Sequence, residues 1–279
     1  MTKIKKPNLL IAGFQKCAST SLYDFLIKHD KIVGSEPKES YYLCDQPEKF
    51  VGNSLIEKKW SNFFGGRIDD TNKYLLEATV VNFYQEKALN YALSNKCKVI
   101  FIVRDPLERL MSIYKYQKNK SILKESGDID FSNFINNVKT GAYKHELLSN
   151  AIEHGKYHKY IEKWRLKVGF ENVFVLGLKD LIGIEKIKLV PLFDFLDIKM
   201  NIGNQMKVAN KSRQPINLKT HLFLVEHFGG KKIPLKNHIL KLYKYFSYKQ
   251  ATKPELGFSL NLELRKQYSE EYKHLSNHF

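Results

Sequence analysis

The stretch 8–26 holds the residue types best suited to binding an anion. A short apolar run ends at Gly13, a loop of small residues carrying Lys16 follows, and three hydroxyl residues at 19–21 open a segment with apolar residues at helical spacing. A strand, a small-residue loop and a helix N-terminus form an anion cradle, because the first amides of the helix and the positive end of its dipole face the loop. The expected ligand is a phosphate-containing nucleotide.

The loop differs from the standard ATP-binding loop. That pattern needs a second glycine followed by Lys and then Ser or Thr. Here Lys16 comes three residues after Gly13, and Ala18-Ser19 stands where Gly-Lys would be. We therefore predict no Walker-type metal site. An ordinary strand-to-helix connection is the alternative interpretation of this segment.

A second stretch, 98–112, delivers an arginine to the end of an apolar run. Arg104 ends the run, Asp105-Pro106 turns the chain into a helix, and Ser112 lies about two turns along it. The planar guanidinium of an arginine can bind phosphate with two parallel hydrogen bonds. The alternative is that Arg104 forms an ion pair with Asp105 or a nearby glutamate.

The apolar pattern predicts an α/β fold with a central parallel β-sheet flanked by helices. Apolar runs without alternation are typical of strands that are buried on both faces. Helical spacing lies between these runs, and strands that alternate with helices favour a parallel sheet. In such sheets ligands bind at the carboxyl ends of the strands, where Gly13 and Arg104 fall. The predicted strands are 9–12, 74–76, 99–103 and 173–176, and the predicted helical stripes begin at 107, 157 and 189, with Pro191 expected to interrupt the last.

Composition indicates a folded protein with a preference for anionic partners. The chain has 279 residues, 43% of them hydrophobic, and a net charge of +17. Residues 201–279 hold 14 Lys and Arg against 5 Asp and Glu. Such an excess favours a nucleotide, an acidic polymer or a membrane surface, and a role in solubility alone is the alternative.

Organisation and cysteine content give further expectations. We predict a single domain over 1–279, with a nucleotide-binding core at about 8–196 and a C-terminal segment 197–279 that wraps it. The three cysteines show no pairing pattern, which fits a reducing compartment. No signal peptide and no transmembrane segment are predicted, so the expected location is the cytoplasm.

The motifs together resemble those of PAPS-dependent sulfotransferases, where PAPS is 3′-phosphoadenosine 5′-phosphosulfate. The loop from Gly13 resembles the family's 5′-phosphosulfate loop, and Arg104 with a serine eight residues on resembles its 3′-phosphate motif. The segment 210–215 resembles a late Lys-Gly-Arg loop, with Ser212 in place of the usual glycine; a solvated basic loop is the alternative. The implied co-substrate ligands are Gln15, Lys16, Cys17, Ala18, Ser19, Thr20, Ser21, Arg104, Ser112, Lys211, Ser212 and Arg213.

The catalytic residues implied by this resemblance are Lys16 and Glu39. The segment 35–43 resembles the Lys-Glu-aromatic segment of carbohydrate sulfotransferases, in which the glutamate is the catalytic base; Glu36 is the competing carboxylate. The segment 75–79 is similar to one near the acceptor, although the family's frequent lysine is Ala78 here. An ordinary surface role is the alternative for each glutamate. The implied acceptor contacts are Glu77, Thr79 and Tyr41.

The resemblance implies a P-loop-NTPase-like sulfotransferase fold and transfer of a sulfuryl group from PAPS to a hydroxyl or amine. The product nucleotide would be adenosine 3′,5′-bisphosphate, and the expected acceptor is a carbohydrate or glycolipid, as in heparan-sulfate-type enzymes. A small lipid or secondary metabolite is the alternative acceptor. A nucleotide kinase of similar fold and a non-enzymatic binder of acidic polymers are the alternative functions. Neither a metal nor a nucleic-acid partner is predicted.

Overall fold

The computed structural model describes residues 6–51, 59–69, 71–119, 130–182, 189–200, 213–215, 217, 248–250 and 254–279. The chain divides into two compact units. The first comprises Met1–Asp105, Lys156–Asn210 and Ser269–Phe279, and the second comprises Pro106–Gly155 and Lys211–Tyr268. The prediction of a single domain stays a prediction.

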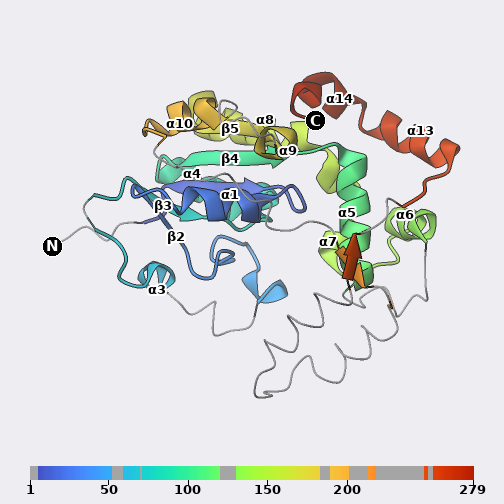
Figure 1. Ribbon diagram of the computed structural model, residues 1–279, viewed down its shortest axis with the longest axis horizontal. Helices are drawn as coiled ribbons and strands as arrows, with labels where there is room; N and C mark the ends of the chain where they lie inside the picture. The colour runs from blue at the N-terminus through green and yellow to red at the C-terminus, as the bar shows by residue number, and fades with distance from the viewer. Residues whose placement is uncertain are drawn as a thin grey trace, which may run out of the picture. The chain divides into compact units, whose positions relative to one another are not determined.

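The first unit contains a five-stranded parallel sheet in the order β2-β3-β1-β4-β5 (Figure 1). The four strands predicted from apolar runs are confirmed, and β2 is an additional edge strand. Their bounds are β1 (Leu9–Gly13), β2 (Ile32–Gly34), β3 (Tyr74–Glu77), β4 (Lys98–Val103) and β5 (Val173–Gly177).

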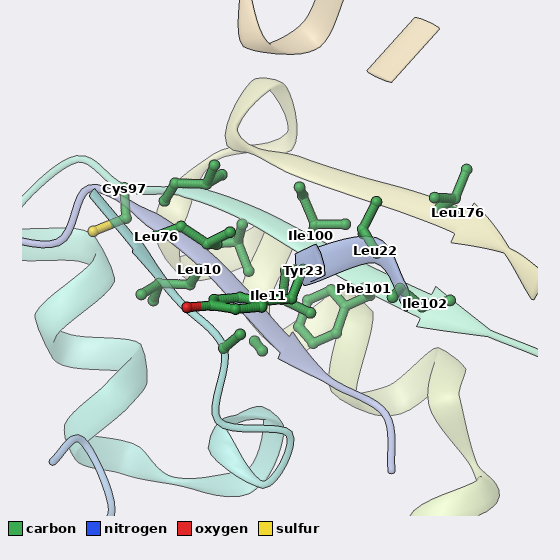
Figure 2. Packing of buried hydrophobic residues seen from close by; sticks show 14 of the residues in the cluster. Leu10, Ile11, Leu22, Tyr23, Leu76, Cys97, Ile100, Phe101, Ile102 and Leu176 are labelled. Carbon is green, nitrogen blue, oxygen red and sulfur yellow. The ribbon is translucent and has the colours of Figure 1, made fainter. Parts of the chain in front are cut away.

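The sheet is buried on both faces, as continuous apolar strands require. Every residue of β1 and of β3 is buried, and so is β4 from Val99 onward. Figure 2 shows side chains of β1, β3 and β4 packed together, with Ile11 beside Phe101. This sheet forms the centre of the unit's hydrophobic core.

Helices cover the two faces of the sheet in the way that right-handed crossovers dictate. The connection from β1 to β2 runs across the sheet in one direction, and those from β3 to β4 and from β4 to β5 run in the other, so their helices lie on opposite faces. Phe25 and Phe193 place two helices together on the first face, with ring centroids 6.2 Å apart. The α-helices in the described part of this unit are α1 (Ser19–Leu26), α3 (Trp60–Phe64), α4 (Glu86–Ser94), α8 (Tyr157–Val168), α9 (Leu178–Ile182), α10 (Val190–Leu196) and α14 (Ser269–Leu275).

The end of the chain packs against the first unit. The Phe279 ring lies 6.4 Å from that of Tyr157 on α8, and a Cβ on Gly177 would overlap the carbonyl oxygen of His278. The Tyr272 hydroxyl of α14 donates to Asp105 just beyond β4, at 3.1 Å. The residues after 268 therefore complete the core of this unit.

The second unit begins with α5 directly after Asp105. Pro106 is the first residue of this helix, as predicted, because a proline there loses no intrahelical hydrogen bond. An aromatic cluster of Tyr114, Phe131 and Phe134 joins its first two helices. The described elements are α5 (Pro106–Asn119), α6 (Phe131–Lys139), α7 (Glu146–Ser149), β6 (Arg213–Pro215), β7 (Tyr248–Gln250) and α13 (Phe258–Gln267), with β6 and β7 antiparallel.

The expectation that Pro191 interrupts its helix is wrong. Pro191 lies in the first turn of α10, where the ring removes an amide that would have no intrahelical acceptor. Leu192, Phe193 and Leu196 are buried on one side of that helix. Across the part of the chain that the structure describes, no helix combines the length and apolar character needed to cross a membrane.

Gly34 at the end of β2 offers a test of the packing between the sheet and α1. An added Cβ would overlap the Tyr23 hydroxyl and the Ile27 side chain. That hydroxyl donates to the Ser35 carbonyl at 2.5 Å. We expect Gly34→Ala to lower the free energy of unfolding by about 1–3 kcal/mol, the usual cost of overpacking, in urea denaturation. The control Gly257→Ala, where an added Cβ has open space, should change it by less than about 1 kcal/mol. Equal effects would contradict the packing described here.

Candidate active site

The loop between β1 and α1 has an unusual backbone. Lys16 and Ala18 both adopt left-handed conformations, with φ of 66° and 68°. Residues other than glycine rarely adopt this conformation, and its cost is accepted where the surrounding structure enforces it. Cys17 between them is fully buried, and its Sγ lies 3.9 Å from the hydroxyl of Tyr157. The loop is therefore held in one shape by its contacts with the core.

Helix α1 begins directly after this loop at Ser19. The first amides of a helix have no intrahelical acceptor, and among the described residues no side chain caps this N-terminus. An anion in the loop would accept hydrogen bonds from these amides and would be stabilised by the helix dipole. Lys16 adds a positive charge to the loop, which is the sign of charge that the predicted anion cradle requires.

Arg104 lies beside this loop, so the two predicted nucleotide motifs meet. Strands β1 and β4 pair in parallel, and the Phe14 amide donates to the Ile102 carbonyl at 3.2 Å. Arg104 follows β4, and its Nη1 donates to the Lys16 carbonyl at 3.3 Å. The guanidinium and the loop therefore both stand at the carboxyl ends of neighbouring strands, where ligands bind in sheets of this kind.

Glu77, the last residue of β3, is a fully buried carboxylate. Ser40 donates to it through its hydroxyl at 2.8 Å and its amide at 3.4 Å, and Thr79 does so through its hydroxyl and through its amide at 3.2 Å. The Asn82 side chain donates to the second oxygen at 2.8 Å. Burial raises the pKa of Glu77 above its usual value, and these hydrogen bonds oppose that shift.

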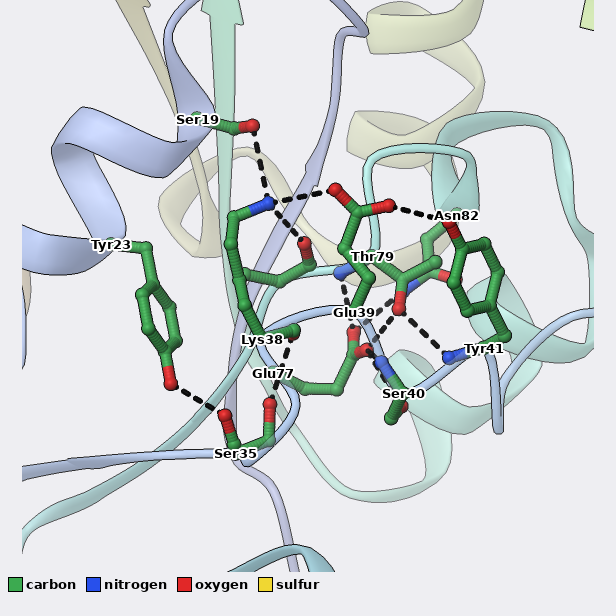
Figure 3. Close-up of polar contacts among 11 residues, drawn as sticks. Ser19, Tyr23, Ser35, Lys38, Glu39, Ser40, Tyr41, Glu77, Thr79 and Asn82 are labelled. Atoms are coloured by element: carbon green, nitrogen blue, oxygen red, sulfur yellow. Dashed lines mark hydrogen bonds and ion pairs between the residues drawn. The ribbon is translucent and has the colours of Figure 1, made fainter. Parts of the chain in front are cut away.

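This network fastens the segment that carries Glu39 (Figure 3). Ser40 is bound to Glu77, and the amide of Tyr41 donates to the Thr79 hydroxyl at 3.1 Å. Glu39 directly precedes these two anchored residues. Its oxygens accept from Lys38 Nζ at 3.0 Å and from the Tyr41 hydroxyl at 2.8 Å. The carboxylate is thus held by contacts on both of its oxygens.

The environments of Glu39 and Glu36 differ. The Glu39 side chain is 30% exposed and contacts Lys38, whose ammonium reaches Ser19 at the start of α1. The Glu36 side chain is 75% exposed and pairs with Arg67 at 3.0 Å. A carboxylate oxygen has lone pairs for more than one donor, so Glu39 can still accept a proton from a bound molecule. Of the two carboxylates, Glu39 is the one connected to the anion cradle.

The structure brings most of the predicted site residues together in the first unit. Loop residues 15–21, Arg104, Glu39 and the segment 77–79 all belong to it. Ser112 lies half-buried on α5 of the second unit. Lys211 and Ser212 lie outside the described residues, and Arg213 is described only as the first residue of β6. These assignments, and the acceptor contacts of Glu77, Thr79 and Tyr41, stay predictions.

Three polar residues of this region were missed by reasoning from the sequence. Ser40 and Asn82 bind Glu77, and Lys38 connects Glu39 to Ser19. The only signal for Lys38 was its position directly before Glu39. Within the described ranges, no group of three or more His, Cys, Asp or Glu side chains is arranged to hold a metal ion.

The parallel sheet, with the loop after β1 and Arg104 at the carboxyl ends of its strands, defines an α/β protein with a P-loop-like arrangement. A family comparison then specifies the class: residues 6–253 match the model of the sulfotransferase domain, and the chain belongs to this family.

Curated relatives are similar at low identity. The mouse protein named bifunctional heparan sulfate N-deacetylase/N-sulfotransferase 4 is 28% identical over 166 residues, which are 57% of this chain and 18% of that protein. Mouse carbohydrate sulfotransferase 15 is 24% identical over 274 residues, covering 74% of this chain and 46% of that protein. The chain therefore spans less than half the length of these relatives.

Solved structures share the fold. A sulfotransferase from Alicyclobacillus acidocaldarius superposes with a TM-score of 0.61 at 19% identity, covering 86% of this chain and 96% of that one. Mouse sulfotransferase SULT7A1, solved in complex with PAP, superposes with a TM-score of 0.54 at 13% identity, covering 98% and 86%. The chain thus has the sulfotransferase fold, as predicted.

Glu77→Gln tests the buried network. The glutamine NH₂ group would then face hydrogen-bond donors in place of a carboxylate oxygen that accepts from them. Because the hydrogen bonds on that side are lost, we expect the free energy of unfolding at pH 7 to fall by about 1–3 kcal/mol. Exposed Glu48→Gln in the 3₁₀ helix Pro47–Lys49 is the control, with an expected change below about 0.5 kcal/mol.

The pH dependence of this loss has a defined sign. Because the folded-state pKa of Glu77 is raised, its contribution to stability is full below the unfolded value of 4.5 and is lost as pH rises through the folded value. The gap between wild type and Glu77→Gln in urea denaturation should therefore be larger at pH 5 than at pH 8. A gap that widens with pH would mean that the hydrogen bonds outweigh burial.

Proposed function

We propose that this protein transfers a sulfuryl group from PAPS to a hydroxyl or amine of a carbohydrate or glycolipid. Membership of the sulfotransferase family supports the reaction. The observation that carries the proposal is the contact of Arg104 with the carbonyl of Lys16, because it joins a phosphate-binding loop to a second phosphate-binding side chain. Two anion contacts side by side suit a nucleotide with phosphates at both its 5′ and 3′ positions.

In this proposal the loop residues hold the 5′-phosphosulfate. The amides of 17–21 and the Lys16 ammonium stabilise the negative charge that grows on the 5′-phosphate oxygen when its bond to sulfur breaks. Arg104 holds the 3′-phosphate, with Ser112, Lys211, Ser212 and Arg213 as further predicted contacts. These cationic and amide groups supply the electrostatic stabilisation without a metal ion.

Glu39 is the proposed general base. It accepts the proton of the acceptor hydroxyl or amine while the acceptor atom bonds to sulfur and the leaving oxygen stays with the nucleotide product, adenosine 3′,5′-bisphosphate. Support comes from its half-buried position and its connection through Lys38 to the start of α1. Exposed Glu36, paired with Arg67, has no such connection.

The acceptor class rests on the relatives and on charge. The names of two relatives refer to heparan sulfate and to carbohydrate, and the net charge of +17 suits an acidic glycan. We also propose a cytoplasmic location, which the three buried free thiols support, since unpaired cysteines persist in reducing compartments.

Nucleotide binding provides the first test. Adenosine 3′,5′-bisphosphate should raise the melting temperature much more than AMP, because AMP lacks the 3′-phosphate that Arg104 is proposed to hold. At a hundredfold excess over its Kd, a ligand adds about 2.7 kcal/mol to the free energy of unfolding, which thermal denaturation detects readily. Arg104→Met should reduce the difference between the two nucleotides. Equal shifts in wild type would overturn the proposed co-substrate.

The choice of base provides the second test. Glu39→Gln keeps the shape and removes the proton acceptor, so labelled sulfate transfer from PAPS to a panel of glycans should fall about 10²–10⁴-fold. Binding of adenosine 3′,5′-bisphosphate should stay unchanged. Glu36→Gln is the matched control and should keep most of the activity. A reversed order of the two variants would move the base to Glu36, and activity in both would place it elsewhere.

A further inference from the structure

Lys38 makes contacts in the site to which the sequence analysis gave no role. Its Nζ donates to Glu39 Oε1 at 3.0 Å, to the Ala78 carbonyl at 3.0 Å and to Ser19 Oγ at 3.4 Å (Figure 3). Its side chain is only 15% exposed. A withdrawn ammonium is costly unless its donors are satisfied, and these three acceptors match its three N–H groups.

The contact with Ser19 has a consequence for the hydroxyl. A serine oxygen that accepts from an ammonium must direct its own proton to another acceptor, and the positive charge makes that proton a stronger donor. Ser19 is the first residue of α1, so its hydroxyl stands where the helix amides favour an anion. The hydroxyl is thereby suited to donate to a phosphate group in the loop.

The contact with Glu39 has a second consequence. Because both side chains touch the same Nζ, the Glu39 carboxylate and the Ser19 hydroxyl can be no further apart than these two contacts laid end to end. A base and an anion-binding group must be separated by about the size of the reacting groups if the acceptor is to lie between them. Lys38 fixes that separation, and the Ala78 carbonyl fixes Lys38.

We propose that Lys38 is a positioning residue that orients the Ser19 hydroxyl as a donor to the 5′-phosphate end of the nucleotide and holds Glu39 beside it. This role rests on the proposed function. It assigns to Lys38 an effect on the 5′ end alone, which a general structural role would not have.

A double-mutant cycle with two nucleotides tests this proposal. Calorimetry would give the Kd of adenosine 3′,5′-bisphosphate for wild type, Ser19→Ala, Lys38→Met and the double variant. Lys38→Met should raise the Kd of adenosine 3′,5′-bisphosphate roughly tenfold, because a hydrogen bond that depends on a charged group contributes about a factor of ten to the affinity. The double variant should bind no more weakly than Lys38→Met, because the lysine acts through the serine.

Adenosine 3′-monophosphate, which lacks the 5′-phosphate, is the ligand control, and its Kd should be the same in wild type and Lys38→Met. Lys31→Met, which changes a lysine before β2 at the other end of the strands, should leave both affinities unchanged. If Lys38→Met fails to fold, Lys38→Gln keeps N–H donors without the charge and should show the same selective loss.

The outcomes separate this proposal from the proposed function. Three results would overturn the role of Lys38 while wild type still binds adenosine 3′,5′-bisphosphate. They are an equal loss of affinity for both nucleotides in Lys38→Met, a loss in the double variant equal to the product of the two single losses, and an unchanged Kd in Lys38→Met. Failure of wild type to bind that nucleotide would instead overturn the proposed function itself.

Discussion

The arrangement of the site depends on a carboxylate withdrawn from water. Glu77 ends β3 with no exposed surface, and a buried carboxylate is tolerated only where hydrogen-bond donors surround it. Ser40 provides donors from the segment after β2, and Thr79 and Asn82 provide them from the segment after β3. The hydrogen bonds to this buried carboxyl group therefore hold the segment after β2 beside the end of β3.

The positions of Lys38 and Glu39 depend on these hydrogen bonds to Glu77. The backbone on their C-terminal side is bound to Glu77 and Thr79, while the Ser35 hydroxyl donates to the Lys38 carbonyl at 3.0 Å on the other side. A segment held at both ends keeps its side chains in few conformations, so little conformational entropy remains to be lost when a ligand binds. The hydrogen bonds to the buried Glu77 thus preorganise the segment that carries Lys38 and Glu39.

The sequence predicted the parts of this protein whose signal is local. Continuous apolar runs identified β1, β3, β4 and β5, and Pro106 marked the start of α5. The edge strand β2 was missed because its three residues, Ile32–Gly34, are too few for a pattern to emerge. Pro191 was misjudged because a proline in a first turn and one in a helix interior look alike until the helix start is known.

Within the site as well, features with a local sequence signal were predicted and features that depend on tertiary packing were not. The loop around Lys16 and the arginine after β4 could be recognised because each motif is contiguous, whereas their contact through the Lys16 carbonyl depends on the parallel pairing of β1 with β4. Lys38 joins residues 19, 39 and 78, a combination that only the folded chain creates. Glu77 was predicted as an acceptor contact from the resemblance of segment 75–79, but its burial follows from tertiary packing and has no sequence signature.

The path of the chain through the first unit affects how the protein is made. Residues 269–279 pack onto a core begun by residues 9–13, so the ends of the described chain meet in one folding unit. During synthesis, the part of the core that residues 269–279 cover stays exposed until the entire second unit has been translated. Domains otherwise tend to fold as they emerge from the ribosome, and an incomplete one exposes surface that invites aggregation. The topology therefore favours completion of the first unit only after residues 269–279 have been synthesised, independent of the chemistry at its site.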